Sequence, residues 1–523
     1  MLRFLSVCVL WCAAAVAQAP PYDVLIVGGR IVDGAGAPWY VADLAIRGDS
    51  IAAIGLLGDG PAALRIDARG LVVAPGFIDI HTHAERDVLE LPAAENYIRQ
   101  GVTTLLGGQC GGSPLPLRPF FEKLARTPIA VNFGLFVGQG SIREAILGRE
   151  NRKATEAEIQ KMRELTRQAM LDGAFGLSTG LFYVPGNYTP TEEVIELAKV
   201  VGRMGGMHIS HMRDEAAGVL DSVRETIRIG EEGGLPTQVT HHKIIGVGNW
   251  GRSKETLQAV QEARARGVDV TIDQYPYTAS STSIGAIFPQ WAMAAGGGGL
   301  QARLAYPALR AKIKAVIVTR LKEDRGGGDP KNVVMARCAE PGLAGKNLAE
   351  ITRARGREVT FENAAETMIE LQLKGGCQGI FHAISEEDVE RILRFPLTMV
   401  GSDGQIPVFG EGNPHPRSYG NFARVLARYV RERQALTLED AVRKMTSLPA
   451  ARLKLLDRGL LRPGMKADIA LFDPARVADK ATFLQPHQYA EGFPWVLVNG
   501  KPVVAHGAVT KERPGRVLYG PAH

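Results

Sequence analysis

Short apolar strand candidates recur along the middle of the chain, and each is followed by a segment whose apolar residues have helical spacing. Stretches such as "ATEAEIQKMRELTRQAMLDGA" and "TPTEEVIELAKVVGRMGG" are amphipathic at the 3.6-residue period of a helix. The strand candidates are residues 76–81, 103–106, 130–136, 174–178, 206–210, 237–240, 269–273 and 397–401. Eight consecutive strand-helix units are typical of a closed parallel barrel, so the middle of this α/β chain is predicted to form a (β/α)8 TIM barrel.

The two ends of the chain have a different pattern. Residues 20–75 contain apolar runs such as "VLIVGGRIV", where Gly28-Gly29 is interpreted as a hairpin turn, and residues 458–523 contain "WVLVNGKPVV", with a hairpin turn at Asn499-Gly500. We therefore predict one small β-sandwich domain built from both ends, around a barrel over residues 76–457. The seventh repeat is longer than the others and indicates an insertion of about 283–345 over the active face.

The first residues have the layout of a secretory signal, predicted over 1–19. Arg3 is followed by an apolar run of about 14 residues and then by small residues, and the run is too short to span a bilayer. Cleavage is expected after Ala15-Val16-Ala17 or after Ala17-Gln18-Ala19, the first being preferred. A lipoprotein form through Cys12 and a retained membrane anchor are weaker alternatives. The mature protein is thus expected to be exported, periplasmic or secreted, without a stable membrane anchor.

Three cysteines follow the predicted signal: Cys110, Cys338 and Cys377. In an exported protein an odd number means a free thiol or a metal ligand, and a disulfide between Cys338 and Cys377 is one option. The formal charge of +6 is spread over 523 residues without a Lys/Arg run. No nucleic-acid partner is expected, and the partner is taken to be a small-molecule substrate.

Groups that can bind a metal stand at the carboxyl ends of the predicted strands. His81 and His83 follow the first strand, and Cys110 lies in "GGQCGG" after the second. The later strands add His211 in "HISHMRDE", the residues His241, His242 and Lys243 in "THHK", and Asp403 in "GSDG". A TIM barrel gathers such strand ends at one rim, where its active sites lie. Each residue alone has an ordinary structural explanation, but the set predicts one site.

The chemistry of this set suits a hydrolase. Imidazole nitrogens with a thiolate favour Zn²⁺, which lowers the pKa of a bound water to about 7. Asp403 could orient the resulting hydroxide, accept its proton and return it to a leaving nitrogen. The expected reaction is attack of metal-activated water on an acyl carbon.

The order H-x-H, "GGQCG", "HMRDE", "HHK" and "GSDG" resembles the amidohydrolase superfamily and, within it, the D-aminoacylase (N-acyl-D-amino-acid deacylase) family. The resemblance covers nearly the whole mature chain. It implies a tight zinc held by Cys110, His211 and His241. His81 and His83 would then hold a second, weaker metal that shares Cys110, and His242 would be a neighbour.

The resemblance also implies that a lysine, a tyrosine and an arginine read the substrate α-carboxylate. Lys243, Tyr275 in "DQYPY" and Arg417 in "NPHPRSYG" stand at the matching places, and Tyr183 in "GLFYVPGNY" is a fourth candidate. The loop from Asp403 to Arg417 is longer than expected for the family. The implied activity is zinc-dependent hydrolysis of N-acyl-D-amino acids to a carboxylate and a free D-amino acid.

Three other functions compete with this one. An exported dipeptidase could act on peptides with a C-terminal D-residue. A cyclic-amide hydrolase of the hydantoinase or dihydroorotase type would be expected to have a carboxylated lysine after strand four, and "GAFGLSTGL" has none. A binding protein without catalysis would not need Asp403 beside the metal set.

Overall fold

The computed structural model describes residues 22–294 and 296–523, so the predicted signal at 1–19 lies outside the described part. The central barrel is built from parallel strands in two sheets, β6-β7-β8 and β9-β10-β11-β12-β13-β17. Only Phe136 separates β8 from β9, and a parallel bridge between Thr82 and Gly404 joins the first strand to the last. The strands are β6 (Phe77–Asp79), β7 (Val102–Gly107), β8 (Asn132–Leu135), β9 (Val137–Gly138), β10 (Gly176–Gly180), β11 (Met207–His211), β12 (Thr237–Val239), β13 (Val270–Gln274) and β17 (Thr398–Val400). Counting β8 and β9 as one interrupted strand, all eight predicted barrel strands are confirmed.

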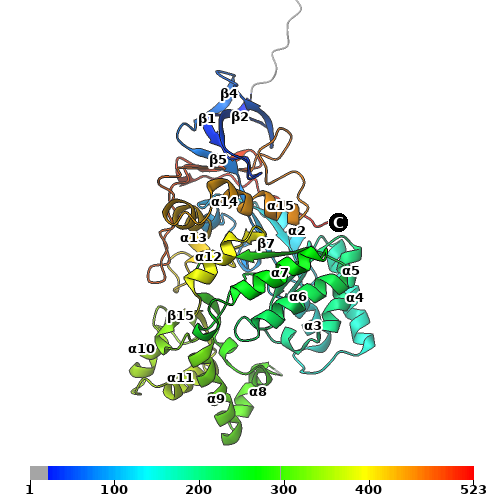
Figure 1. Ribbon diagram of the computed structural model, residues 1–523, viewed down its shortest axis with the longest axis vertical. Coiled ribbons are helices and arrows are strands. Elements are labelled where there is room, and N and C mark those ends of the chain that lie inside the picture. Colours follow the sequence, from blue (N-terminus) through cyan, green and yellow to red (C-terminus); the bar gives the residue numbers. More distant parts are fainter. Residues whose placement is uncertain (1–21, 295) are drawn as a thin grey trace, which may run out of the picture.

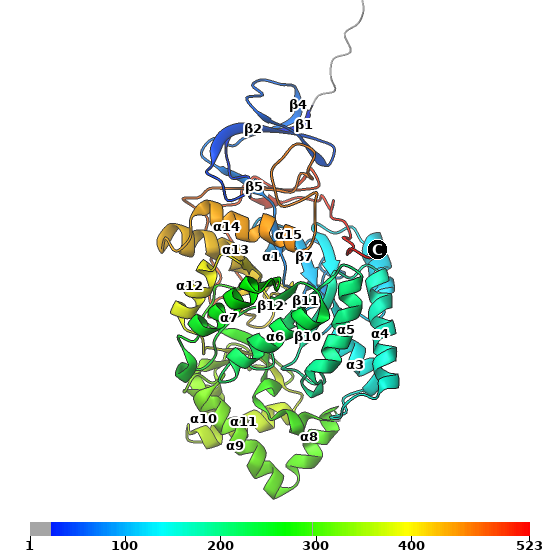
Figure 2. The same cartoon turned by 45° about the vertical axis from the view of Figure 1, so that its right-hand side comes forward.

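Helices cover the outside of the barrel, and α4 to α7 form a row along one side (Figures 1 and 2). Capping residues in the sequence determine where some of these helices begin and end. A capping box between Thr155 and Glu158 starts α4, and Gly234, in the left-handed region with φ 67°, ends α6. The helices are α1 (Glu95–Ile98), α2 (Arg118–Arg126), α3 (Gln139–Leu147), α4 (Glu156–Leu171), α5 (Thr191–Arg203), α6 (Val219–Gly233), α7 (Ser253–Ala265), α12 (Glu386–Arg394), α13 (Arg417–Arg424), the π-helix η7 (Val425–Glu432), α14 (Leu438–Met445) and α15 (Ser447–Arg452). Short 3-10 turns are η1 (Ala84–Arg86), η2 (Gly186–Tyr188), η3 (Val247–Asn249), η4 (Ile284–Ile287), η5 (Gln290–Met293) and η6 (Pro330–Asn332).

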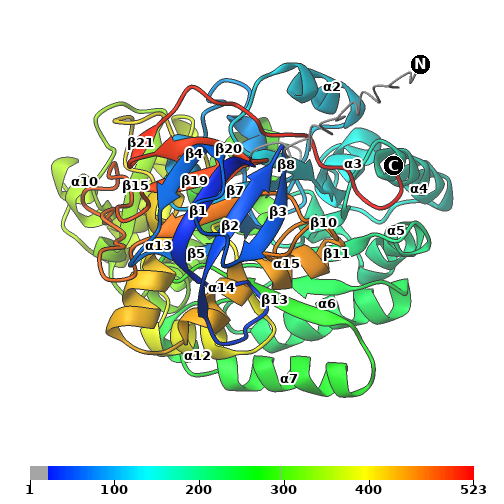
Figure 3. The same ribbon diagram turned by 90° about the horizontal axis from the view of Figure 1, so that it is seen from above.

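Strands from both chain ends form one nine-stranded sheet beside the barrel (Figure 3). Strand β5 joins the two halves, since it pairs in parallel with β1 and antiparallel with β18. The sheet surrounds its own apolar core, to which Ile26 and Leu44 contribute from one end of the chain and Ile469 and Leu497 from the other. The strands are β1 (Tyr22–Ile31), β2 (Tyr40–Arg47), β3 (Ser50–Gly55), β4 (Ala62–Asp67), β5 (Val72–Pro75), β18 (Ile469–Phe472), β19 (Trp495–Val498), β20 (Lys501–Ala505) and β21 (Ala508–Val509).

The two predicted hairpin turns have different outcomes. Asn499 and Gly500, with φ of 46° and 78°, connect the antiparallel strands β19 and β20, which confirms that turn. The turn predicted at Gly28-Gly29 is wrong, because β1 runs straight through the glycine pair. Its pairing with β2 shifts register between Ile26 and Gly29, so the glycines form a bulge in a continuous strand.

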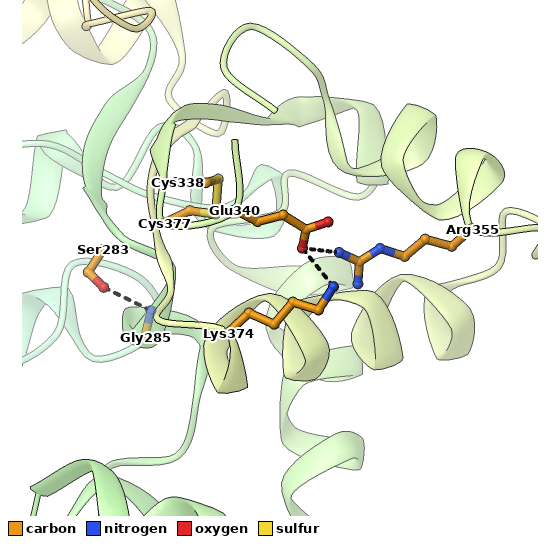
Figure 4. Close-up of a disulfide and its surroundings, with 7 residues drawn as sticks. All are labelled: Ser283, Gly285, Cys338, Glu340, Arg355, Lys374 and Cys377. Atoms are coloured by element: carbon orange, nitrogen blue, oxygen red, sulfur yellow. Dashed lines mark hydrogen bonds and ion pairs between the residues drawn. A yellow bond between two sulfur atoms is a disulfide. The ribbon is translucent and has the colours of Figure 1, made fainter. Parts of the chain in front are cut away.

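The inserted unit lies between β13 and α12 and occupies residues 280–381, reaching past residue 345. Its antiparallel sheet has the order β14-β16-β15. Strand β16, the last of the three in the sequence, therefore lies between the other two. The disulfide between Cys338 and Cys377, whose pairing the sequence left open, joins β15 to β16 beside the ion pairs of Glu340 with Arg355 and Lys374 (Figure 4). The elements are β14 (Ser280–Ser283), α8 (Gly296–Leu304), α9 (Pro307–Glu323), β15 (Val333–Cys338), α10 (Leu348–Ala354), α11 (Phe361–Leu373) and β16 (Cys377–Phe381).

The last residues of the chain lie against the barrel at the amino ends of its strands. Val517 forms a parallel bridge with Phe133, and the backbone N–H of Gly520 donates to Gly173 O at 2.9 Å. This is the end opposite to the strand termini that bear the predicted site residues. No helix in residues 22–294 and 296–523 combines the length and the apolar character needed to cross a bilayer.

Candidate metal centre

The strand-end residues converge on one buried point. His81 and His83 follow β6, Cys110 follows β7, His211 ends β11, and His241 follows β12. Their ligand atoms form two groups in which all atoms lie within 4.8 Å of one another. The two groups are His81, His83, Cys110 and Asp403, and Cys110, His211 and His241, so Cys110 belongs to both.

The distances from Cys110, which belongs to both groups, fit a tetrahedral cation. Cys110 Sγ lies 3.5 Å from Nε2 of His81 and 3.5 Å from Nε2 of His241, and His241 Nε2 lies 2.8 Å from His211 Nδ1. Zinc bonds of about 2.3 Å to sulfur and about 2.0–2.1 Å to nitrogen, at a tetrahedral angle, place the two ligand atoms about 3.6 Å apart. Although burial raises the pKa of the Cys110 thiol, the charges of His241, His81 and His211 hold it well below its ordinary value. The sulfur–nitrogen distance and the thiolate–imidazole chemistry therefore fit Zn²⁺, whereas the 2.8 Å between the nitrogens of His241 and His211 is a hydrogen-bonding distance, shorter than the about 3.3 Å set by two tetrahedral zinc–nitrogen bonds.

Three residues of the site adopt an unusual backbone conformation. Cys110, His241 and Asp403 have φ of 54°, 36° and 51°, in the left-handed region that non-glycine residues rarely occupy. Each such residue costs about 1–3 kcal/mol, and such strain is concentrated at functional sites. All three residues lie within three positions of the end of a barrel strand.

The histidines of the first group each have a carboxylate beside the second ring nitrogen. His81 Nδ1 lies 3.3 Å from Asp273 Oδ1, and His83 Nδ1 lies 3.8 Å from Glu85 Oε1. Carboxylates in this position orient the ring of a metal-binding histidine and determine which nitrogen carries its proton. The sequence analysis did not single out Asp273 or Glu85, although each lies at or near a predicted strand end.

One further carboxylate, Glu215, serves both histidines of the second group. Its Oε1 lies 3.2 Å from His241 Nδ1, and its Oε2 lies 3.8 Å from His211 Nε2. Glu215 is the last residue of the quoted "HMRDE" motif, four positions after His211. That spacing is a signal for it, but the sequence analysis gave it no role.

Asp403 faces the first group and is held by cations. Its Oδ1 lies 3.1 Å from His83 Nε2 and 3.6 Å from His81 Nε2, and Arg417 Nη1 lies 2.8 Å from its Oδ2. Burial raises the pKa of this carboxyl, but the charges of Arg417 and His241 outweigh that effect and hold it well below the ordinary value. Asp403 is therefore ionised and able to accept a proton.

The four residues expected to contact a substrate carboxylate lie around the same point. The guanidinium of Arg417 lies 4.7 Å from the ring centre of Tyr275, and Lys243 Nζ lies 5.7 Å from it. The buried hydroxyl of Tyr275 has no hydrogen-bond partner. The ring of Tyr183 lies 4.6 Å from that of His211. The structure thus brings two cations and an unpaired phenol O–H next to the metal ligands, which is an arrangement suited to a carboxylate.

His242 points away from the metal centre. Its Nε2 lies 2.8 Å from Thr256 Oγ1, and burial lowers its pKa to about 3. It is a neutral, hydrogen-bonded core residue, in agreement with the neighbour role expected for it.

Sequence reasoning also missed a side chain that reaches the site from outside the barrel. Arg325 comes from the inserted unit, and its Nη2 lies 3.0 Å from Glu215 Oε2. Its guanidinium also lies 4.4 Å from the ring centre of Phe182. The turn after α9 has no local feature that would predict a contact with the barrel.

Comparisons with known proteins find relatives over nearly the whole chain. The model of the Amidohydrolase family matches residues 65–504. A D-aminoacylase of Alcaligenes xylosoxydans xylosoxydans is 39% identical over 96% of this chain and 98% of its own. The crystal structure of the N-acyl-D-glutamate deacylase of Bordetella bronchiseptica, complexed with zinc and a phosphonate mimic of the tetrahedral intermediate, has a TM-score of 0.83 at 36% identity and covers 96% of this chain and all of the other. A D-aminoacylase structure described as having a binuclear metal centre has a TM-score of 0.81 at 37% identity, over 95% of this chain and 100% of that one.

Proposed function

The chain belongs to the amidohydrolase family, and from that premise we propose that it hydrolyses the amide bond of N-acyl-D-amino acids with the help of zinc. The observation that carries the proposal is the donor set in which Cys110 is common to two groups of histidines beside the ionised Asp403. The relatives supply the substrate class, since they are a D-aminoacylase and an N-acyl-D-glutamate deacylase that was crystallised with zinc.

Cys110, His211 and His241 would hold the tightly bound zinc, and His81 with His83 would hold a second, weaker metal through the shared thiolate. When bound, zinc supplies Lewis-acid chemistry that activates water and polarises a carbonyl group. The carboxylates of Asp273, Glu85 and Glu215 keep the histidine rings in position.

Asp403 performs the proton transfers. Its lowered pKa keeps it ionised, the form that can accept the proton of the attacking water, and it then delivers this proton to the nitrogen that leaves as the amine of the D-amino acid. Arg417 restrains one of its oxygens, so that the other, Oδ1, faces His81 and His83. The direction of the carboxylate is thereby set before substrate enters.

Arg417, Lys243 and Tyr275 would bind the α-carboxylate of the substrate. In the structure Arg417 pairs with Asp403 and has further N–H donors to offer. The three donors of Lys243, by contrast, face Glu215 and His241, so Lys243 would exchange one of these contacts for the substrate carboxylate. Tyr275 offers its unpaired O–H, and burial raises its pKa so that it stays protonated. Tyr183 would line the same pocket, beside His211.

Metal analysis combined with a turnover screen tests this function. Purified protein should contain zinc and should hydrolyse N-acetyl-D-amino acids in preference to their L-enantiomers. A zinc-free active protein would contradict the metal assignment. Equal rates for both enantiomers, or turnover of cyclic amides alone, would contradict the substrate class.

We propose in addition that the protein is exported after cleavage of the signal at 1–19. The disulfide between Cys338 and Cys377 supports this, because disulfides persist mainly in oxidising compartments. Sequencing of the mature N-terminus should find Gln18 or Pro20. An intact Met1 on cytoplasmic protein would refute export.

A further inference from the structure

The inserted unit sends Arg325 into the metal centre. Arg325 follows α9, at the start of a turn of three glycines, and is only 2% exposed. Its side chain reaches Glu215 Oε2 and packs on Phe182 at the distances given above. A buried guanidinium is expected to have an anionic partner, and Glu215 is the carboxylate it contacts.

Glu215 in turn lies beside both histidines of the second group, His211 and His241. A histidine that offers one ring nitrogen to a metal carries its proton on the other, and the group that accepts this proton orients the ring. The two oxygens of Glu215 face Nδ1 of His241 and Nε2 of His211. A movement of Glu215 would therefore disturb both rings at once.

Two cations hold Glu215 in place. Lys243 Nζ donates to Oε1, and Arg325 Nη2 donates to Oε2. The ammonium of Lys243 also lies 2.7 Å from His241 Nδ1 and donates to His241 O at 2.8 Å, so its three donors are occupied. Arg325 is therefore the cation on the Glu215 oxygen that Lys243 does not contact.

The turn that bears Arg325 is closely packed against its surroundings. A Cβ atom added to Gly246, in the loop after β12, would lie 2.3 Å from Glu323 O, and one added to Gly327 would lie 2.4 Å from His382 O. The N–H of Gly328 donates to Leu321 O at 3.2 Å. The backbone on both sides of Arg325 is therefore fixed relative to the barrel.

We propose that Arg325 is a positioning residue of the metal centre, which fixes His211 and His241 through Glu215, so that the inserted unit completes a site whose ligands all belong to the barrel. The proposal rests on the proposed function only in taking these two histidines as zinc ligands. The identity of the substrate does not enter it.

Zinc affinity, measured by competition with a chelator, tests the proposal. Arg325→Gln should weaken zinc binding about 10-fold, the lower end of the effect of groups that orient metal ligands. Arg325→Lys, which keeps the cation but lacks the planar fork, should show a smaller but measurable loss of about threefold. Arg310→Gln is the matched control, because it removes the ion pair with Glu366 inside the inserted unit and should leave zinc affinity unchanged.

A double variant separates positioning from general destabilisation. In a Glu215→Gln background, Arg325→Gln should weaken zinc binding no further, because the link it acts through is already lost. Zinc affinity of Arg325→Gln within about twofold of wild type, or an equal loss in Arg310→Gln, would overturn the proposal. So would an unfolded Arg325→Gln beside an Arg325→Lys protein with unchanged affinity, since Arg325 would then serve folding alone.

The same measurements distinguish this proposal from the proposed function. A wild-type protein that binds zinc but hydrolyses no N-acyl-D-amino acid would refute the substrate class and leave the effect of Arg325 on zinc intact. A wild-type protein that binds no zinc would refute both.

Discussion

Replacing Asp403 by asparagine should slow bond cleavage while the metal remains bound. Asparagine keeps the shape of the side chain and its φ of 51°, which Asn tolerates better than most residues. It cannot accept the proton of the attacking water. General acid-base catalysis contributes about 10²–10⁴-fold, so kcat should fall by about 10²-fold or more, equivalent to about 2.7 kcal/mol of transition-state stabilisation.

The same change should also destabilise the fold. Arg417 is 6% exposed and loses its charged partner 2.8 Å away. Leaving one member of a buried ion pair unpaired costs about 3–5 kcal/mol, which is an upper limit here because the amide oxygen of asparagine still accepts a hydrogen bond. The pKa of Asp403 is lowered in the folded state, so its contribution to stability is present above the unfolded pKa and is lost only as pH falls through the folded value. The difference in Tm between wild type and Asp403→Asn should therefore be the same at pH 5 and pH 8.

The assay is hydrolysis of a saturating N-acetyl-D-amino acid, with zinc content and Tm measured on the same preparations. The expected result is low kcat at full zinc occupancy in a folded protein. Near-normal turnover by Asp403→Asn would refute the proton-transfer role. A loss of turnover that tracks a loss of zinc would show instead that Asp403 acts as a metal ligand.

Three further predictions concern the metal, the substrate and the inserted unit. Cys110→Ala should lose zinc and activity yet remain folded, as judged by metal analysis and circular dichroism, and a metal-free but fully active variant would contradict the site. Lys243→Ala should lower kcat/KM and nearly abolish the preference for a free acid over the corresponding amide, because only the acid has a charge to pair; unchanged discrimination would remove Lys243 from carboxylate recognition. Replacing Cys338 and Cys377 by serine opens a loop with a sequence separation of 39 and should cost up to about 4 kcal/mol, seen as a lower Tm that no longer responds to reductant; a Tm equal to that of the oxidised wild type would contradict a stabilising role.

The barrel and the convergence of its candidate metal-binding residues could be predicted because their signals are local. Each barrel strand is a short apolar run, and the residue types that bind metals follow directly after it. A parallel barrel brings those positions to one rim whatever the details of its loops. His81, Cys110 and Asp403 therefore come together in the structure as the strand order alone predicts.

The groups that hold the ligands could not be found in the same way. Asp273 and Arg325 belong to common residue types, and only tertiary contacts distinguish them from surface charges, while the spacing of Glu215 from His211 is a signal that does not reveal its partners. Arg325 in particular reaches the barrel because the glycine turn after α9 packs against the loop at Gly246. A position defined by packing between distant segments has no signature in a single sequence.

The wrong turn at Gly28-Gly29 has a related cause. A glycine pair between apolar runs is common to a hairpin and to a bulge in a continuous strand. In the structure β1 pairs with β2, β4 and β5, and these partners require its full length. Pairing with these strands, and not the local sequence, therefore determines that the glycine pair forms a bulge.

Joining the first and last strands of the chain in one sheet has a consequence for biosynthesis. The ribosome completes β5 at Pro75 but does not reach β18 until Ile469. At about 5–20 residues per second, β5 waits roughly 20–80 s for its antiparallel partner. During that interval the edge of an apolar sheet stays unpaired, which is a form of exposure that favours aggregation. The nascent chain should therefore depend on a chaperone for much of its synthesis, and the small domain should be the last part of the molecule to become protected from hydrogen exchange.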